Sequence, residues 1–386
     1  MDELTNPYRP GAGTTPPALI GRDDLLRQFA ITVGRAKGGR PGKSVMAVGL
    51  RGVGKTVLLN RFSEIAVEQG FDVAFIEATD SGDFPTVLAV RLRKILLELD
   101  RGSVSRHVAR ALRVLKSFTL QLPDGSTIQL DPEPMLGAAD SGRLDDDLTD
   151  VLVAVAEAAR DRERGVLVAV DEVQYLSERE LSALIVAVHR ATQLNLPLVV
   201  VGAGLPQLPG LAGEARSYSE RLFEFPEIGS LQDGDARAAL DIPAREAQVA
   251  FTEDALTELV SRSQGYPYFL QEWGYHVWNH AINSPVPADD VHAVQPLVLA
   301  ALDRDFFRVR LDRLTPKERE YLRAMAKLGP GPHRSGDIAT RLDVRVESVA
   351  PRRSDLIRKG MIYSPAHGDT AFTVPLFDEF LKRVMP

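Results

Sequence analysis

The stretch GLRGVGKT, from Gly49 to Thr56, combines residue types that bind phosphate. It fits the pattern G-x-x-x-x-G-K-[ST] and stands between an apolar run and a helical one, where that pattern has to lie. Glycines let backbone N–H groups curl around phosphate oxygens, and the following helix N-terminus adds partial positive charge. Lys55 would contact the β- and γ-phosphates, and the Thr56 hydroxyl would ligate Mg²⁺. The predicted phosphate-binding residues are Gly49, Gly52, Val53, Gly54, Lys55 and Thr56.

Two adjacent acids, Asp171 and Glu172, end the apolar run VLVAVDE. Ligands bind at the carboxyl ends of strands in α/β sheets, so these acids are expected at the same site. Asp171 would hold Mg²⁺ through water, and Glu172 would act as general base on an attacking water. The alternative, a helix N-cap on a solvated edge, is less favoured beside the glycine-rich loop. No Asn-Lys-x-Asp motif for guanine is present, so ATP is favoured over GTP.

Short apolar runs alternate with helix-sized segments and must position these residues. Such alternation is typical of a mainly parallel sheet with helices on both faces. The stretch 118–130, FTLQLPDGSTIQL, alternates around Pro-Asp-Gly and predicts an inserted β-hairpin. Its role is open between a partner-docking arm and a cover on the sheet edge. The predicted strands span 44–50, 71–78, 165–172, 196–204 and 222–228.

The C-terminal segment predicts three helices followed by a hairpin, which is the order of a winged helix-turn-helix. Residues 301–386 carry 17 Lys and Arg against 12 Asp and Glu, whereas residues 1–300 carry 29 against 41. Positive charge near the third helix predicts contacts to duplex DNA phosphates. Nearby acids dilute this charge, and a winged helix used for protein contact is the alternative. The candidate DNA contacts are Arg352, Arg353, Arg358 and Lys359.

The composition limits the class of protein. A chain of 386 residues predicts two or three domains. It has no cysteine, which excludes disulfides and Cys-based zinc sites and fits a cytoplasmic protein. No apolar run has the roughly 18 residues of a membrane span, and no secretory signal is recognisable at the N-terminus. We therefore expect a cytoplasmic protein with no membrane contact.

Four motifs, PPALIGRDDLL, GLRGVGKT, VLVAVDEVQYL and GYPYFLQ, follow one another in the chain. In this order they resemble the AAA+/STAND superfamily of P-loop ATPases, and most closely the bacterial and archaeal ATPases related to origin-recognition initiators. The resemblance covers most of the chain. It implies a five-stranded α/β ATPase core over residues 1–230, a helical lid over 231–295 and a winged helix over 296–386.

The resemblance also implies roles for residues outside the phosphate motifs. Ile20 and Arg22 would lie near the adenine. Arg221, just before the last strand of the core, would reach the γ-phosphate of a neighbouring subunit in a homo-oligomer; an ion-paired surface arginine is the alternative. Gly265-Tyr266-Pro267 resembles the Gly-x-Pro of signalling STAND ATPases, so Tyr266 or Pro267 could rest on the nucleotide.

Two departures from the family pattern argue for slow, regulated hydrolysis. The fourth strand ends in Gly202, Ala203 and Gly204, where relatives place a polar side chain that orients water, and Gln207 is the nearest candidate. The stretch around Tyr266 also lacks the arginine that many relatives direct at the γ-phosphate. The sequence thus predicts an ATP- and Mg²⁺-dependent switch that binds DNA. The alternative is a signalling ATPase whose winged helix binds a protein partner.

Overall fold

The computed structural model describes residues 1–11, 16, 19–79, 83–101, 105–122, 130, 132–366 and 368–385. The chain forms two compact units, each made of segments that are separate in sequence. The core unit consists of Asp23–Val48 and Lys55–Glu227. The lid unit consists of Met1–Arg22, Gly49–Gly54 and Ile228–Pro386. The division into three domains stays a prediction.

The core unit is built on a five-stranded sheet of order β2-β3-β4-β1-β5. Every neighbouring pair is parallel, as the alternating pattern predicted. β3 lies between β2 and β4, with Val168 aligned to Ala74 and Val200. The strands are β1 (Ser44–Val48), β2 (Phe71–Glu77), β3 (Gly165–Asp171), β4 (Leu198–Gly204) and β5 (Phe223–Glu224).

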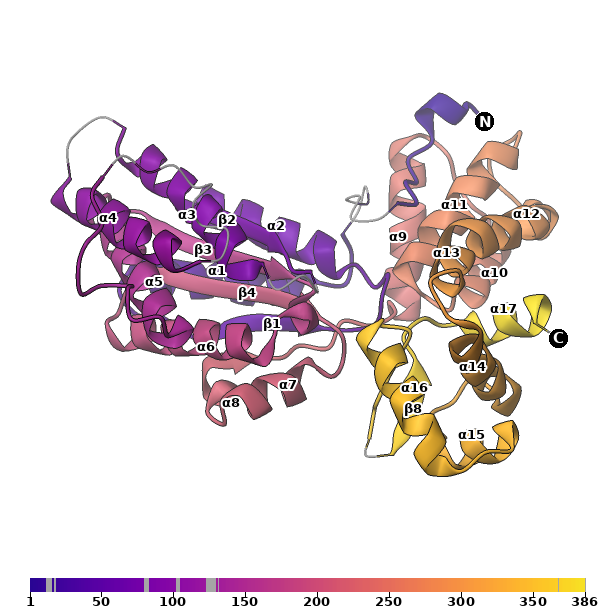
Figure 1. Cartoon of the computed structure of the whole chain (residues 1–386). Helices are drawn as coiled ribbons and strands as arrows, with labels where there is room; N and C mark the ends of the chain where they lie inside the picture. The colour runs from indigo at the N-terminus through magenta and orange to yellow at the C-terminus, as the bar shows by residue number, and fades with distance from the viewer. Residues whose placement is uncertain are drawn as a thin grey trace. The chain divides into compact units, whose positions relative to one another are not determined.

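Helices cover both faces of this sheet (Figure 1). Local signals set their ends: α6 begins with a capping box in which Ser177 and Glu180 satisfy each other's backbone N–H groups. α5 opens with three aspartates, which suit the positive end of the helix dipole. The helices are α1 (Asp23–Lys37), α2 (Lys55–Glu68), α3 (Phe84–Leu99), α4 (Arg106–Gln121), α5 (Leu144–Asp161), α6 (Glu178–Gln193), α7 (Leu208–Ala215) and α8 (Ser219–Leu222).

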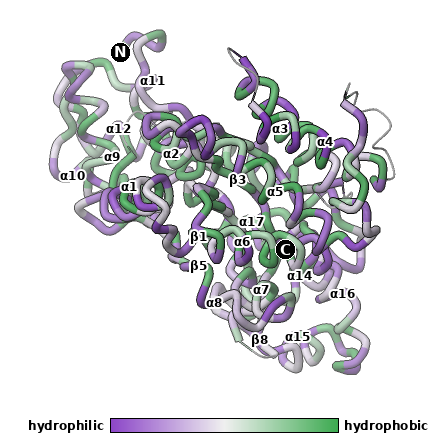
Figure 2. The backbone as a smooth tube through the Cα atoms, turned by 90° about the vertical axis from the view of Figure 1, so that its left-hand side faces the viewer, coloured by the Kyte–Doolittle hydropathy of each residue, from purple (hydrophilic) through white to green (hydrophobic). Residues whose placement is uncertain are grey.

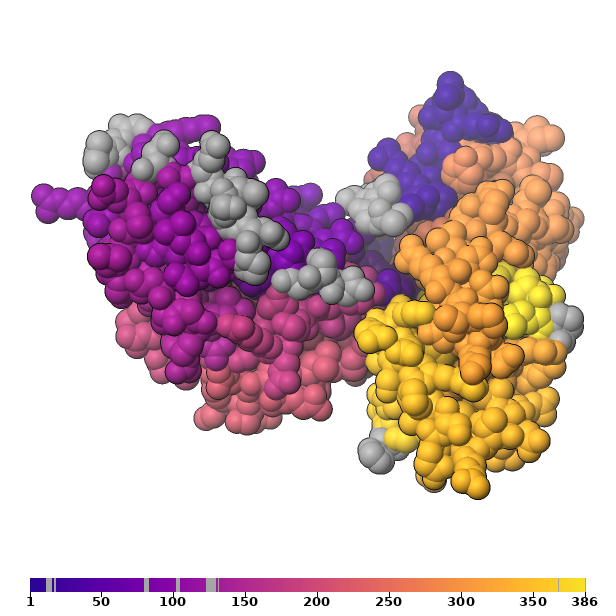
Figure 3. All heavy atoms as spheres, viewed as in Figure 1, coloured from indigo at the N-terminus to yellow at the C-terminus, as the bar shows by residue number. Residues whose placement is uncertain are grey.

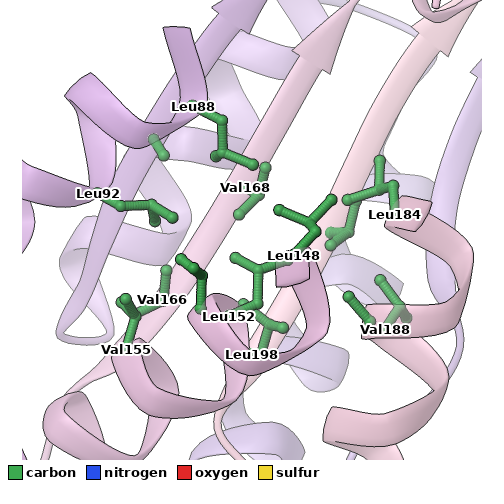
Figure 4. Packing of buried hydrophobic residues seen from close by; sticks show 14 of the residues in the cluster. Leu88, Leu92, Leu148, Leu152, Val155, Val166, Val168, Leu184, Val188 and Leu198 are labelled. Carbon is green, nitrogen blue, oxygen red and sulfur yellow. The ribbon is translucent and has the colours of Figure 1, made fainter. Parts of the chain in front are cut away.

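One hydrophobic cluster fills the face of the sheet under α3, α5 and α6. Figure 4 shows Leu88 and Leu92 of α3 and Leu148 of α5 directed at Val168 of β3. Side chains alternate along a strand, so Leu167 and Ala169 face the other side. The helices are amphipathic, and the hydropathy colour changes repeatedly along α3 and α4 in Figure 2. This packing fixes the carboxyl end of β3, where the acids of the candidate site stand.

The predicted hairpin over 118–130 is wrong in its first part. Phe118 to Gln121 form the last turn of α4, and Phe118 is buried in the cluster. The residues of the predicted turn, 123–129, lie outside the described residues.

The lid unit contains a helical bundle followed by a small α/β domain. The bundle consists of α9 (Asp233–Glu246), α10 (Glu253–Ser263), α11 (Pro267–His280) and α12 (Ala288–Ala301). A π-helix (Leu302–Arg308) and the short α13 (Val309–Leu311) continue α12. Phe307 of the π-helix stacks on Phe380 with ring centroids 5.2 Å apart, so the bundle and the C-terminal helix share packing. In Figure 3 the orange and yellow atoms of these segments lie directly against each other.

The C-terminal part of the lid unit has the predicted winged-helix architecture. β6 and β7 each pair antiparallel with β8. Thr315 and Glu318 form a full capping box at the start of α14, with Pro316 as the first residue of the helix. α16 begins at Val346, so Pro351 lies inside the helix. The elements are α14 (Pro316–Leu328), β6 (His333–Arg334), α15 (Ser335–Leu342), α16 (Val346–Arg358), β7 (Ile362–Tyr363), β8 (Asp369–Phe372) and α17 (Phe377–Val384).

The N-terminal segment packs against the helical bundle. Residues Glu3–Thr5 form a 3₁₀ turn. Tyr8 is 1% exposed, its hydroxyl donates to the carbonyl of Leu240 at 2.5 Å, and its ring meets Trp278 edge-on. Gly274 makes room, because a Cβ there would lie 2.7 Å from the Tyr8 ring. The first residues of the chain are therefore part of the lid unit's core.

Candidate nucleotide site

In the core unit, the structure brings together the two predicted Mg²⁺ ligands. Lys55 and Thr56 are the first residues of α2, and Asp171 is the last residue of β3. The Thr56 hydroxyl donates to Asp171 Oδ2 at 2.5 Å. Lys55 and Asp171 are only 7% and 5% exposed. Residues 115 positions apart in sequence thus form one polar site in an otherwise apolar core.

Burial raises the pKa of Asp171 above its usual range, and the charge of Glu172 adds to the rise. The Thr56 hydroxyl, the Glu172 backbone N–H and the Lys55 ammonium act in the opposite direction without cancelling it. A buried carboxylate of this kind is stabilised by a cation, and a hydroxyl with a carboxylate oxygen suits Mg²⁺. Across the described residues no group of three or more His, Cys, Asp or Glu could hold a metal. This donor set fits Mg²⁺, which in such sites takes its other ligands from water and substrate phosphates.

Glu172 follows Asp171 in a left-handed backbone conformation, with φ of 53°. It caps the 3₁₀ turn Val173–Tyr175. The Gln174 side chain donates from Nε2 to Glu172 Oε2. Gln174 could not be recognised from the sequence, because its contact with Glu172 depends on the turn Val173–Tyr175.

The glycine-rich segment Gly49–Gly54 belongs to the lid unit. Gly52 and Gly54 have φ of +88° and +91°, which other residues rarely adopt. A Cβ on Gly49 would lie 2.1 Å from the Ile228 carbonyl oxygen, so only glycine fits there. Glycine is therefore required at Gly52 and Gly54 by the backbone conformation and at Gly49 by the close approach of another backbone segment.

Tyr266 holds this segment in place. Its hydroxyl donates to the carbonyl of Arg51, and the N–H of Tyr268 donates to the carbonyl of Gly52 at 3.3 Å. Burial raises the pKa of Tyr266, whose side chain is 1% exposed. The predicted contact of Tyr266 or Pro267 with the nucleotide stays a prediction. Pro267 is the first residue of α11 and is half-buried.

Ile20 and Arg22 are half-buried in the lid unit. Arg22 donates to the carbonyl of Gly229 at 2.7 Å. Burial lowers the pKa of Arg22, although the charge of Asp235 opposes that change. Their place near the adenine stays a prediction.

Arg310, which the sequence analysis missed, lies close to Arg51 in the lid unit. Its guanidinium lies over the Phe306 ring at 4.0 Å and donates to the Phe306 carbonyl. Burial and the charge of Arg51 lower its pKa to about 10. No carboxylate pairs with Arg310 in the part of the chain that the structure describes. A half-buried cation close to Arg51 of the glycine-rich segment has the properties of an anion ligand.

Arg221 stands on α8, directly before the edge strand β5. Its side chain is exposed, and within the described ranges the guanidinium has no bonding partner. Its role in a neighbouring subunit stays a prediction, and its exposure leaves it accessible to one.

The four predicted DNA contacts differ in their surroundings. Arg353 donates to Thr370 Oγ1 at 2.9 Å and to Ser364 Oγ at 2.7 Å, and so fastens α16 to the hairpin. Lys359 pairs with the buried Glu318 at 2.8 Å. Arg358 is exposed and pairs with Asp355, and Arg352 is half-buried. Arg358 and Arg352 are therefore the better placed of the four for an external phosphate.

The parallel sheet, the glycine-rich turn and the paired Thr56 and Asp171 define a P-loop ATPase fold. Residues 18–201 match the family model of the AAA ATPase domain. Residues 304–381 match a domain of unknown function. No curated protein sequence matches the chain. Within the described residues no helix combines the length and apolar character needed to cross a membrane.

Several solved structures are similar to this chain over almost its whole length. The Walker-type ATPase PABY2304 of Pyrococcus abyssi is 16% identical, with a TM-score of 0.54 over 94% of this chain and 96% of that one. At this identity the likeness concerns the fold alone. The RuvB Holliday junction branch migration motor of Thermotoga maritima is 15% identical, with a TM-score of 0.46 over 96% and 99%. Cdc6p of Pyrobaculum aerophilum is 15% identical, with a TM-score of 0.45 over 100% and 99%.

Proposed function

We propose that this protein binds ATP with Mg²⁺ and hydrolyses it slowly, as a nucleotide-dependent switch. The observation that carries the proposal is the 2.5 Å hydrogen bond between Thr56 and Asp171, because it joins the two Mg²⁺-ligand positions. Mg²⁺ would neutralise charge on the phosphates when bound. Lys55 and the N–H groups of the loop would bind the phosphates, and Arg310 is a further candidate ligand.

In the proposed reaction, water attacks the γ-phosphorus and the bond to the β–γ bridging oxygen breaks. Glu172 accepts a proton from the water, and the products are ADP and phosphate. Gly202 and Gly204 have no side chain that could orient the attacking water, and the stretch around Tyr266 lacks an arginine. Both features support a slow rate of ATP hydrolysis. We expect turnover by the isolated protein below about 1 s⁻¹, the low end of ordinary enzymes.

Phosphate release by the purified protein tests this proposal. We expect slow Mg²⁺-dependent release that stops in Lys55→Ala, which should also lose ATP binding. Arg61→Ala, an exposed surface change in the same unit, is the matched control. Release that persists unchanged in Lys55→Ala would contradict the proposal.

We further propose that the winged helix binds duplex DNA through phosphate contacts, supported by the excess of basic residues after residue 300. The logarithm of the binding constant should fall linearly with the logarithm of salt, with a slope of about −0.9 per phosphate contact. Replacing both Arg352 and Arg358 with Ala should weaken binding and reduce the slope. No DNA binding at low salt, together with nucleotide-dependent oligomers, would favour the alternative of a protein partner.

A further inference from the structure

The carboxyl end of β4 contains no polar side chain that could reach the Glu172 carboxylate. It reads Gly202, Ala203 and Gly204. A Cβ on Gly202 would lie 2.3 Å from Met46 Sδ and 2.8 Å from a Val173 methyl carbon, and one on Gly204 would lie 2.9 Å from both Gln174 Oε1 and a Leu208 methyl carbon. The glycines therefore leave room for neighbouring side chains, among them those of the turn Val173–Tyr175, which contacts this strand.

The Gln174 amide bridges Glu172 and the end of β4. Its Oε1 accepts the backbone N–H of Leu205 at 3.0 Å, and its Nε2 donates to Glu172 Oε2. The amide has only one orientation that satisfies both neighbours, because a backbone N–H can only donate and a carboxylate can only accept. The side chain is thus fixed at both of its polar atoms.

Gln207, the candidate from the sequence analysis, does not take part in this bridge. Its Oε1 is buried and has no hydrogen-bond partner in the described structure. The two glutamines therefore differ in one testable respect, since only Gln174 is bonded to Glu172.

From this bridge we infer that Gln174 is a positioning residue, which holds the Glu172 carboxylate against the end of β4. It supplies from the turn after β3 the polar group that β4 itself lacks. A neutral amide can orient a carboxylate without neutralising it, so Glu172 keeps its capacity to accept a proton. The inference rests on the proposed ATP hydrolysis, and it predicts a defect in the chemical step with nucleotide binding unchanged.

The test compares three variants with the parent in phosphate release and in ATP binding. Gln174→Met keeps the approximate size of the side chain and removes both hydrogen bonds. Gly204→Ala keeps Gln174 but places a methyl group against its Oε1 and against a Leu208 methyl carbon. Gln193→Ala, an exposed glutamine of the same unit, is the matched control. We expect kcat to fall about 10- to 100-fold in the first two variants, since misplacing a catalytic group by 1 Å can cost about 10² in rate. KM and the affinity for ATP should stay near parental values in both, the melting temperature should stay near the parental value in Gln174→Met, and Gln193→Ala should behave as the parent.

Each other outcome overturns the inference in a recognisable way. Parental kcat in Gln174→Met would mean that the hydrogen bonds do not position Glu172. A loss of ATP binding equal to the loss of kcat would mean that Gln174 supports the whole site. An equal loss of kcat in Gln193→Ala would mean that the effect is not specific to the hydrogen bonds of Gln174. If the parent itself releases no phosphate, the proposed hydrolysis fails first and the inference fails with it.

Discussion

At the scale of single residues, Asp171 links the chemistry of the site to the stability of the fold. Burial raises its pKa above the usual 3.8, so the folded protein holds this proton more firmly than the unfolded one. The free energy of unfolding therefore falls as pH rises from 3.8 through the raised pKa. Without a cation, the charged carboxylate costs stability at neutral pH.

Asp171→Asn should consequently raise the melting temperature of the nucleotide-free protein at pH 7. The amide oxygen can accept the Glu172 backbone N–H, the amide NH2 can donate to the Thr56 hydroxyl oxygen, and the buried charge is gone. The gain should shrink toward pH 4, where the parental carboxyl becomes neutral. Thermal melts across this pH range measure the effect, with Asp100→Asn, an exposed aspartate of the same unit, as control. A variant less stable than the parent at pH 7 would contradict the account.

The residues of the phosphate site could be predicted because each lies inside a short local pattern. Lys55, Thr56 and Asp171 needed only their neighbours in sequence to be recognised. Gln174 and Arg310 could not be found in this way. The roles of these two residues depend on the backbone N–H group, aromatic ring or charge that the fold brings next to them. No sequence pattern predicts these contacts.

At the scale of elements, the parallel sheet was predictable and the end of α4 was not. Phe118 to Gln121 alternate between apolar and polar residues over too few positions to distinguish a strand from a helix. Val108, Ala111, Leu112, Leu115 and Phe118 are buried in steps of three, one, three and three residues, which continues one helix face. Reading these residues with the preceding helix, and not with the following Pro-Asp-Gly, gives the observed structure.

The N-terminal segment is an element whose importance follows only from tertiary packing. Tyr8→Ala should lower the free energy of unfolding of the lid unit by about 3–5 kcal/mol, as aromatic truncations in cores do. Tyr8→Phe loses only the hydroxyl bond to Leu240 and should cost about 1 kcal/mol. Denaturant unfolding followed by tryptophan fluorescence can measure both, since Trp278 adjoins Tyr8.

Leu4→Ala provides the control for this element, because Leu4 is 94% exposed and should contribute almost nothing. A cost for Tyr8→Ala no larger than that for Leu4→Ala would mean that the N-terminal segment does not belong to the core of the lid unit.

At the scale of the whole molecule, we predict that the rate of ATP hydrolysis depends on the formation of a homo-oligomer. Arg221 is exposed before the edge strand and could serve the site of a neighbouring copy. Arginines supplied in this way raise turnover by about 10³–10⁵ in other P-loop enzymes. Arg221→Ala should therefore reduce hydrolysis only at concentrations where the parent oligomerises, measured by phosphate release and light scattering together. The same loss in a proven monomer would rule out a role between subunits.

The other predictions depend on the proposal that Lys55, Thr56, Asp171 and Glu172 of the core unit belong to one ATP-hydrolysing site. The most direct test is to measure ATP binding and phosphate release in Glu172→Gln. We predict that the variant binds ATP as the parent does, while phosphate release falls by about 10²–10⁴-fold, the usual contribution of a general base. Release at the parental rate from a variant that binds ATP would contradict the account.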